Sequence, residues 1–215
     1  MPVALTAVLY GVVLVTAYAS AQVPEPPAPH PRLPLATSAA LLVVGVPTAL
    51  QLTVAPALLQ HLQRDWPAIG SGQLWRLGSS LVVQDGGLPG TVFNLVSLAL
   101  VGTAAERRWG ARRWLVVALG AGVGAQLWGA LVQPVGAGNS VAVFGLAGSL
   151  AVLALRRGDR VQQLLGAGGL LAATVLLVAG DLHGGAVAIG GALAVLLLRR
   201  AARRPVAAPR REAAG

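Results

Sequence analysis

Long apolar runs dominate the pattern of hydrophobic and polar positions in this chain. Seven of them reach or approach the ~18 residues that a helix needs to cross a bilayer. They cover residues 3–21, 35–59, 88–105, 114–132, 139–155, 163–179 and 182–198. Polar and apolar residues do not alternate within them, as they would in the strands of a transmembrane barrel. The pattern therefore predicts an all-α membrane protein in which each run forms one spanning helix.

The segments between the runs predict how the chain is divided. Residues 1–34 are expected to form an extra N-terminal membrane helix and a stiff linker that contains six prolines. Residues 35–198 are expected to form a six-helix membrane domain, and residues 199–215 a disordered, Arg-rich tail. Ala19-Ser20-Ala21 resembles a signal-peptidase site, but no positive charge precedes the first run, which favours a retained helix.

Composition and charge support a multi-pass protein and predict its orientation. Hydrophobic residues make up 55% of the chain and charged residues only 11%. The net charge is +9, and all residues that carry a positive charge in this count are Arg. The arginines within 107–113, 156–160 and 199–211, together with Arg32, fall on one side of the predicted membrane. Only Arg64 and Arg76 fall on the other side. This asymmetry predicts a cytoplasmic C-terminus and an external loop at 60–87, and it explains the charge without nucleic-acid binding.

Two further features bear on localisation and chemistry. The complete absence of Lys suggests a GC-rich genome. The expected location is a bacterial plasma membrane. With no Cys, the chain has no disulfide and no thiol nucleophile. His30 lies in the proline-rich linker and His61 in the external loop, without a second ligand near either. We therefore expect neither a metal nor an organic cofactor.

Ser140 and His183 are the best candidates for chemistry. Each lies 16 residues before a cytoplasmic arginine, Arg156 or Arg199, on a helix that runs from outside to inside. At ~1.5 Å per residue, both side chains lie roughly 24 Å above that flank. Asn94 lies at a similar level on a third helix. Polar groups that share one depth in a membrane predict a site, since an unpartnered imidazole there is costly.

Small residues predict that the two helices approach closely. Gly145, Gly148 and Ser149 line one helix, and Gly184, Ala188 and Gly191 line the other. A histidine within reach could activate Ser140 as a nucleophile. Asn94 or the Ser140 backbone N–H could then stabilise an oxyanion. The competing structural interpretation is that Ser140 bonds its own backbone and Asn94 only packs helices.

Asp181 is not expected to complete a triad. It lies two residues before His183, so on a helix it would point to roughly the opposite face. Its expected role is the N-cap of the last helix. The prediction is therefore a Ser–His dyad.

In these residues the chain resembles the rhomboid intramembrane serine proteases, over about residues 35–198. The matching pieces, in order, are Gly72-Gln73-Leu74-Trp75-Arg76-Leu77, Phe93-Asn94-Leu95, Glu106-Arg107-Arg108-Trp109-Gly110, Gly138-Asn139-Ser140, Phe144-Gly145-Leu146 and His183-Gly184-Gly185. The resemblance implies a rhomboid-like six-helix bundle that cuts transmembrane protein substrates in the lipid bilayer. It implies Ser140 as nucleophile, His183 as base and Asn94 as oxyanion donor.

Three positions depart from the family pattern. Val141 follows the serine where the family usually has Gly, and Gly90 stands where a second oxyanion donor, His, is usual. Gln84 replaces a loop histidine, a change expected to be structural. Gly90 and Val141 leave open an alternative, a weakly active or inactive rhomboid-like protein that binds transmembrane helices. A small transporter is disfavoured, because the spans show no clear paired charges or broken helices.

Overall fold

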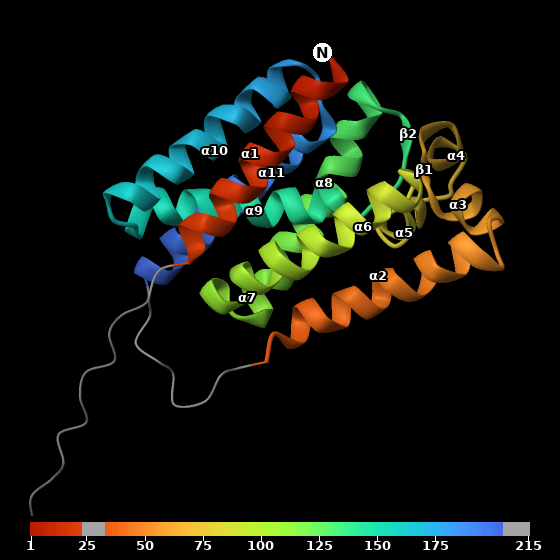
Figure 1. Cartoon of the computed structure of the whole chain (residues 1–215). Helices are drawn as coiled ribbons and strands as arrows, with labels where there is room; N and C mark the ends of the chain where they lie inside the picture. Colours follow the sequence, from red (N-terminus) through yellow and green to blue (C-terminus); the bar gives the residue numbers. More distant parts are fainter. Residues whose placement is uncertain (23–32, 204–215) are drawn as a thin grey trace, which may run out of the picture.

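The computed structural model describes residues 1–22 and 33–203. Within these ranges, seven helices are long and apolar enough to cross a membrane, which confirms the predicted all-α fold class. They are α1 Val3–Ala21, α2 Leu35–Thr53, the composite span Gly87–Trp109, α8 Ala111–Val132, α9 Ser140–Arg157, α10 Arg160–Val178 and α11 Leu182–Ala202 (Figure 1). The predictions for His30, Arg32 and the tail beyond residue 203 fall outside the described residues. The helix α11 extends past the boundary expected at residue 198.

The composite span corrects one prediction. It consists of α6 Gly87–Ser97, a π-helical turn η1 Leu98–Gly102 and α7 Thr103–Trp109. The apolar run that predicted this span ends at residue 105, but the helix continues to Trp109, and α8 begins directly after Gly110. The reason is that the Glu106 carboxylate accepts hydrogen bonds from the backbone N–H groups of Ala36 and Thr37, at 2.9 and 2.7 Å. It thereby caps the start of α2.

The loop at 60–87, which the charge pattern predicts to be external, and the residues just before it form short elements that tie the loop to the segment before Ser140. These are α3 Ala57–Leu62, β1 Arg64–Asp65, α4 Trp66–Gly70 and α5 Arg76–Ser79. The strand β1 pairs antiparallel with β2 Val135–Gly136. Arg64 is buried and donates to the side chain of Gln126 and, at 3.0 Å, to the carbonyl of Gln133. This buried guanidinium fastens the loop to the end of α8.

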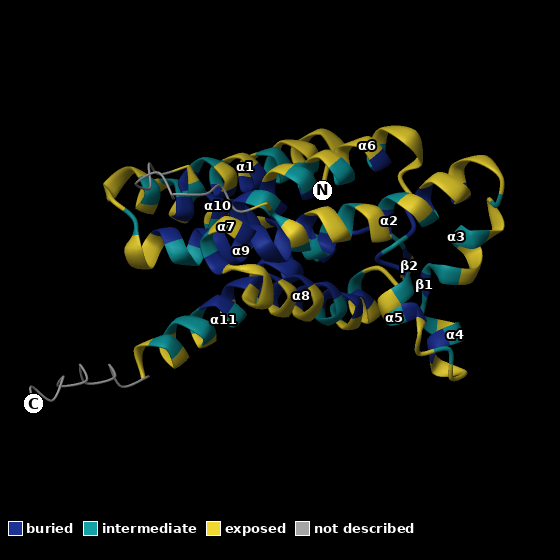
Figure 2. Cartoon of the chain, turned by 90° about the horizontal axis from the view of Figure 1, so that it is seen from below, coloured by how far each residue is buried: buried dark blue, intermediate teal, exposed yellow. Residues whose placement is uncertain are grey.

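The helix α9 lies at the centre of the bundle, and 61% of its length is buried (Figure 2). It touches α11 almost backbone to backbone. A Cβ atom added at Gly190 would lie 2.0 Å from the Gly145 carbonyl oxygen, and one at Gly148 would lie 2.3 Å from the Val187 carbonyl oxygen. Real Cβ atoms do not come so close, so this approach depends on glycine.

The predicted close approach of these two helices is thus confirmed. Two residues that were expected to line the interface between them, however, do not lie in it. Ala188 is exposed. Gly184 faces α10, since a Cβ there would lie 2.3 Å from the Leu177 nitrogen. Glycines on α11 therefore allow close packing against two helices, α9 and α10. A stripe of small residues in the sequence does not show which neighbour each glycine contacts.

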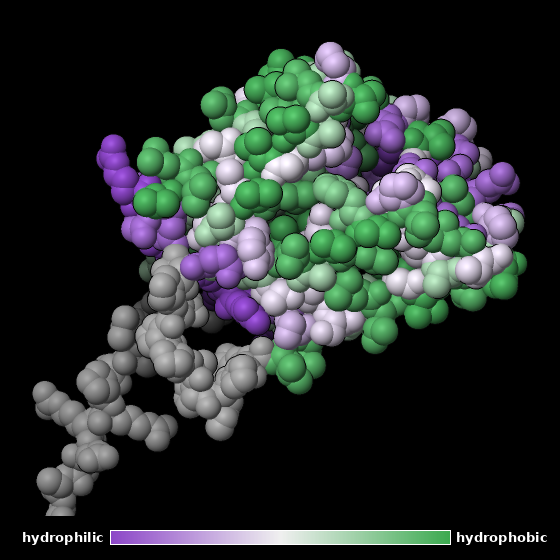
Figure 3. Space-filling view, viewed as in Figure 1, coloured by the Kyte–Doolittle hydropathy of each residue, from purple (hydrophilic) through white to green (hydrophobic). Residues whose placement is uncertain are grey.

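The first helix, α1, packs along α10 and against α9 (Figure 1). Val13, Leu14 and Ala17 are buried in that interface. A Cβ atom at Gly169 of α10 would lie 2.6 Å from Thr16 Oγ1, so these two helices also approach closely. Figure 3 shows apolar surface over most of the visible face, with hydrophilic residues gathered toward its ends.

We predict that Gly190→Ala destabilises the protein although alanine has the higher helix propensity, because the new methyl group would force α9 and α11 apart. The matched control is Gly168→Ala on α10, where a Cβ meets nothing within 4 Å. The control should be neutral or gain up to ~1 kcal/mol, whereas Gly190→Ala should lose roughly 1–3 kcal/mol, as overpacking does. Thermal unfolding in detergent micelles measures both, and equal midpoints would contradict the close contact.

Candidate active site

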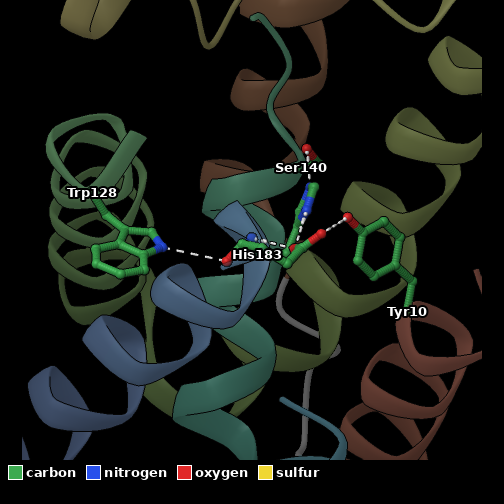
Figure 4. Close-up of polar contacts among 5 residues, drawn as sticks. Tyr10, Trp128, Ser140 and His183 are labelled. Atoms are coloured by element: carbon green, nitrogen blue, oxygen red, sulfur yellow. Dashed lines mark hydrogen bonds and ion pairs between the residues drawn. The ribbon is translucent and has the colours of Figure 1, made fainter. Parts of the chain in front are cut away.

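Ser140 and His183 meet at the N-terminal ends of two neighbouring helices. Ser140 is the first residue of α9, and His183 is the second residue of α11. The His183 Nε2 atom lies 2.9 Å from the Ser140 Oγ atom (Figure 4). The hydrogen bond that their shared depth predicted is therefore present.

The segment that leads into Ser140 is held by the external loop. The Gly138 N–H donates to the Ser80 carbonyl at 2.8 Å, and the Ala137 N–H donates to the Asp85 carboxylate at 2.8 Å. Gly138 has a φ of +138°, which favours glycine. A Cβ there would also lie only 3.3 Å from the Asn94 amide nitrogen and 3.5 Å from Ser140 Oγ. The turn therefore leads into Ser140 without a side chain at position 138 that would crowd the Ser140 hydroxyl.

Asp181 contacts His183, contrary to the sequence-based expectation. Its Oδ1 atom accepts from the His183 backbone N–H at 2.8 Å, which confirms the N-cap, and the same atom lies 3.1 Å from the ring nitrogen Nδ1. The expectation of opposite faces assumed a helical Asp181. As the N-cap, however, Asp181 has extended backbone angles, with φ −83° and ψ 139°, and its side chain turns back over the first turn.

Tyr10 is a site residue that the sequence did not reveal. Its hydroxyl donates to the second Asp181 oxygen, Oδ2, at 2.7 Å (Figure 4). The Trp128 indole N–H donates to the Asp181 carbonyl at 3.3 Å. The only signal for Tyr10 was a lone phenol in the middle of an apolar run, and a buried tyrosine hydroxyl usually has a partner.

Opposing effects act on the Asp181 carboxyl. Burial acts to raise its pKa, but the hydrogen bonds from His183 and Tyr10 outweigh burial and hold the pKa below its usual value. Asp181 is therefore a carboxylate at neutral pH.

The His183 ring packs against two aromatic rings that also contact each other. Its centroid is 4.5 Å from that of Tyr10 and 4.6 Å from that of Phe144, with tilted planes in both cases. Tyr10 and Phe144 also meet edge to face at 5.1 Å. These contacts restrict rotation of the imidazole about its side-chain bonds.

Asn94 lines the same cavity as the Ser–His pair and belongs to a buried amide network. Its side-chain nitrogen donates to Gln84 Oε1 at 2.7 Å, and Gln84 Nε2 donates to Asn139 Oδ1 at 2.8 Å. The Gln84 backbone is bound in turn by the Gln51 side chain. One of the two Asn94 amide protons is thus engaged. Its role as an oxyanion donor remains a prediction.

The cavity has a volume of about 210 Å³. Besides Ser140, His183 and Asn94, its walls include two of the three positions that depart from the family pattern, Gly90 and Val141. Val141 is 1% exposed, and a Cβ atom at Gly90 would meet nothing within 4 Å. The wall at Gly90 is therefore open where a side chain could fit.

Comparison with known proteins places this arrangement in a family. Residues 71–201, more than half of the chain, match the Rhomboid domain. The chain belongs to the rhomboid family. A region of 88 residues is 38% identical to the Rhomboid protease GluP of Bacillus subtilis (strain 168). The matched region is 40% of this chain and 17% of that relative, so this rhomboid spans a small part of its relative's length.

The rhomboid match and the seven apolar helices together identify a multi-pass integral membrane protein with a rhomboid-type all-α fold. The matched residues contain the spans from α6 to α11 and therefore Asn94, Ser140, Asp181 and His183. The helix α1, which carries Tyr10, lies outside the match. The boundaries expected at residues 34 and 198 remain predictions.

We predict that Gln84→Ala destabilises this rhomboid by roughly 2–4 kcal/mol, because it leaves the Asn94 amide nitrogen and Asn139 Oδ1 without their Gln84 side-chain partner. Gln163→Ala is the matched control, since Gln163 is exposed and its amide bonds only a backbone carbonyl. Chemical or thermal unfolding in micelles should show a change below about 0.5 kcal/mol for the control. Equal stability of the two variants would refute the network's structural role.

Proposed function

We propose that this rhomboid is an intramembrane serine endopeptidase that cleaves transmembrane-helix substrates. The observation that carries the proposal is the 2.9 Å contact between Ser140 Oγ and His183 Nε2 in a chain of the rhomboid family. Ser140 is the nucleophile and His183 the general base. No metal or organic cofactor takes part in this proposal.

The proposed reaction proceeds in two steps. His183 Nε2 takes the proton of the Ser140 hydroxyl while Oγ bonds to the scissile carbonyl carbon, and the resulting imidazolium then protonates the leaving amine. A water molecule, deprotonated by the same imidazole, hydrolyses the acyl-enzyme and releases the second product. The negative oxygen formed in each step would be stabilised by the Asn94 amide and by the Ser140 backbone N–H. The latter, at the start of α9, has no acceptor within its own helix.

The cavity wall supports hydrolysis within a membrane. Its lining combines polar side chains, among them Asp85, Gln126 and Gln133, with apolar ones, including Phe93 and Leu182. A polar wall can hold the water that hydrolysis consumes, while an apolar wall suits the side chains of a membrane-spanning substrate. The partners of this rhomboid are thus transmembrane proteins in the surrounding lipid bilayer.

The distribution of charge supports the proposed orientation. Arg156, Arg157, Arg199 and Arg200 lie in the last turns of α9 and α11, whereas Ser140 and His183 lie in the first turns. By the positive-inside rule, the arginine end is cytoplasmic and the site lies toward the outer leaflet. The proposed location is the bacterial plasma membrane with a cytoplasmic C-terminus.

A second candidate function is a rhomboid that binds transmembrane helices without cutting them. Gly90 and Val141 favour it, because the first lacks a hydrogen-bond donor and the second puts a branched side chain beside Ser140. A fluorophosphonate probe separates the two functions, since it reacts only with an activated serine. Absence of labelling in well-folded wild-type protein would favour the binding function.

We predict that Ser140→Ala and His183→Ala abolish fluorophosphonate labelling and lower cleavage by at least ~10³-fold, because each removes one half of the proton-transfer pair. Labelling is measured in liposomes, and cleavage with a fluorescent transmembrane peptide. Ser71→Ala and His61→Ala, both at exposed positions, are the matched controls and should behave like the wild type. Labelling of the Ser140→Ala variant at the wild-type rate would disprove the assignment of the nucleophile.

We predict that Gly90→His accelerates cleavage about 10- to 100-fold, because the new imidazole can donate to the oxyanion. Space is available, as no atom lies within 4 Å of the added Cβ. The matched control, Gly90→Ala, changes the backbone freedom without adding a donor. If the kcat values of the two variants agree, the added imidazole does not reach the reacting oxygen.

A further inference from the structure

The Asp181 carboxylate connects the first helix of the chain to the Ser–His pair. One of its oxygens contacts His183 at two points, the backbone N–H at 2.8 Å and Nδ1 at 3.1 Å. The other oxygen accepts from the Tyr10 hydroxyl at 2.7 Å. These contacts connect Tyr10 through Asp181 and His183 to Ser140, and Figure 4 marks them with dashed lines. This line of contacts joins residues 171 positions apart in the sequence.

The direction of the hydrogen bonds in this line follows from its chemistry. A carboxylate can only accept, so Asp181 requires a proton on His183 Nδ1. A neutral imidazole with that proton has a lone pair on Nε2. Nε2 is the atom that lies 2.9 Å from Ser140 Oγ, so it accepts the hydroxyl proton. The carboxylate therefore selects the tautomer that a general base needs, and it stabilises the imidazolium that forms during the reaction.

Asp181 is held from several sides. Its backbone N–H donates to the Leu176 carbonyl at 2.9 Å, and its carbonyl accepts from the Trp128 indole. The Tyr10 hydroxyl donates to Asp181 Oδ2, and the Tyr10 ring centroid lies 4.5 Å from that of His183. Helices α1, α8, α10 and α11 thus all contact Asp181, α1 and α11 through its carboxylate and α8 and α10 through its backbone. A cap alone would need only the backbone N–H contact.

We propose that Asp181 is a positioning residue for the general base, and that Tyr10 makes α1 a part of the catalytic unit. This inference rests on the proposed protease function. Asp181 orients His183 through the contact of Oδ1 with Nδ1, and Tyr10 orients Asp181 through the hydrogen bond to Oδ2. The site is then a Ser–His–Asp arrangement with a tyrosine from outside the matched rhomboid domain.

The test compares Asp181→Ser and Tyr10→Phe, alone and combined, in the full-length protein. Serine preserves the N-cap but has no carboxylate, and phenylalanine preserves the ring but has no hydroxyl. Asp159→Ser is the matched control for the first change, because Asp159 caps α10 at an exposed turn. Tyr18→Phe is the control for the second, since Tyr18 lies on the same helix and no hydrogen bond from its hydroxyl is found in the described part of the chain. Labelling rate, kcat, KM and the thermal midpoint are measured for each.

Asp181→Ser should lower kcat and the labelling rate about 10- to 100-fold, with KM unchanged. A correctly positioned general base typically accelerates a reaction ~10²–10⁴-fold, and loss of its orientation should remove part of that acceleration. Tyr10→Phe should lower both about fivefold, the value of one ordinary hydrogen bond. In the Asp181→Ser background, Tyr10→Phe should have no further effect, because the two residues act in series. Both controls should stay within about twofold of the wild type.

Additive effects of the two substitutions, or a normal labelling rate in either variant, would overturn the inference. If Asp181→Ser does not fold, Tyr10→Phe decides alone, since it leaves the cap intact. The proposed function fails separately, when wild-type protein shows no labelling that depends on Ser140. An active wild type with unaffected variants refutes only the roles of Asp181 and Tyr10.

Discussion

The contact between the backbones of α9 and α11 is the constraint on which the rest of the structure depends. Within a membrane, burial of apolar side chains does not drive two helices together, since lipid is equally apolar. Association then depends on close packing, and here Gly145, Gly148 and Gly190 remove the side chains that would keep the axes apart. Because the two helices approach so closely, short side chains at their ends can reach each other. Ser140 needs no long partner and no bridging water to contact His183.

The site also uses a general property of helices, namely the polar groups left unpaired at their N-termini. Ser140 and His183 both lie within the first two residues of their helices. Backbone N–H groups, a capping carboxylate and amide side chains from neighbouring segments gather at that level. The same atom of Asp181 caps α11 and contacts the imidazole. One group thus meets a structural need and a chemical one, which reduces the number of polar atoms that the membrane must accommodate.

The sequence predicted those features that depend on local composition or on distance along a helix. Apolar length indicated the seven spans, and counting residues from the arginines put Ser140 and His183 at one level. The errors have physical causes that lie outside such patterns. Asp181 was misplaced because its capping conformation is extended. The span expected to end at residue 105 continues past it, and the Glu106 carboxylate pairs with the distant start of α2.

Other features could not be predicted because they depend on which helices become neighbours. Glycines on α11 contact both α9 and α10, although in the sequence they form one stripe. Tyr10 has no charged residue near it in the sequence, and its partner is known only once α1 lies along α10. Gln84 looked like a simple replacement of another loop residue, yet it connects Asn94, Asn139 and Gln51. Networks of this kind combine segments that no periodicity relates.

The separation between Tyr10 and Asp181 has a consequence for biosynthesis. Tyr10 is translated well before Asp181 and His183, which follow only after six of the described spans. Until α11 has been made, Ser140 has no His183 imidazole beside it, and the Tyr10 phenol has no Asp181 carboxylate. The proposed catalytic arrangement can therefore form only when α11 packs into the bundle.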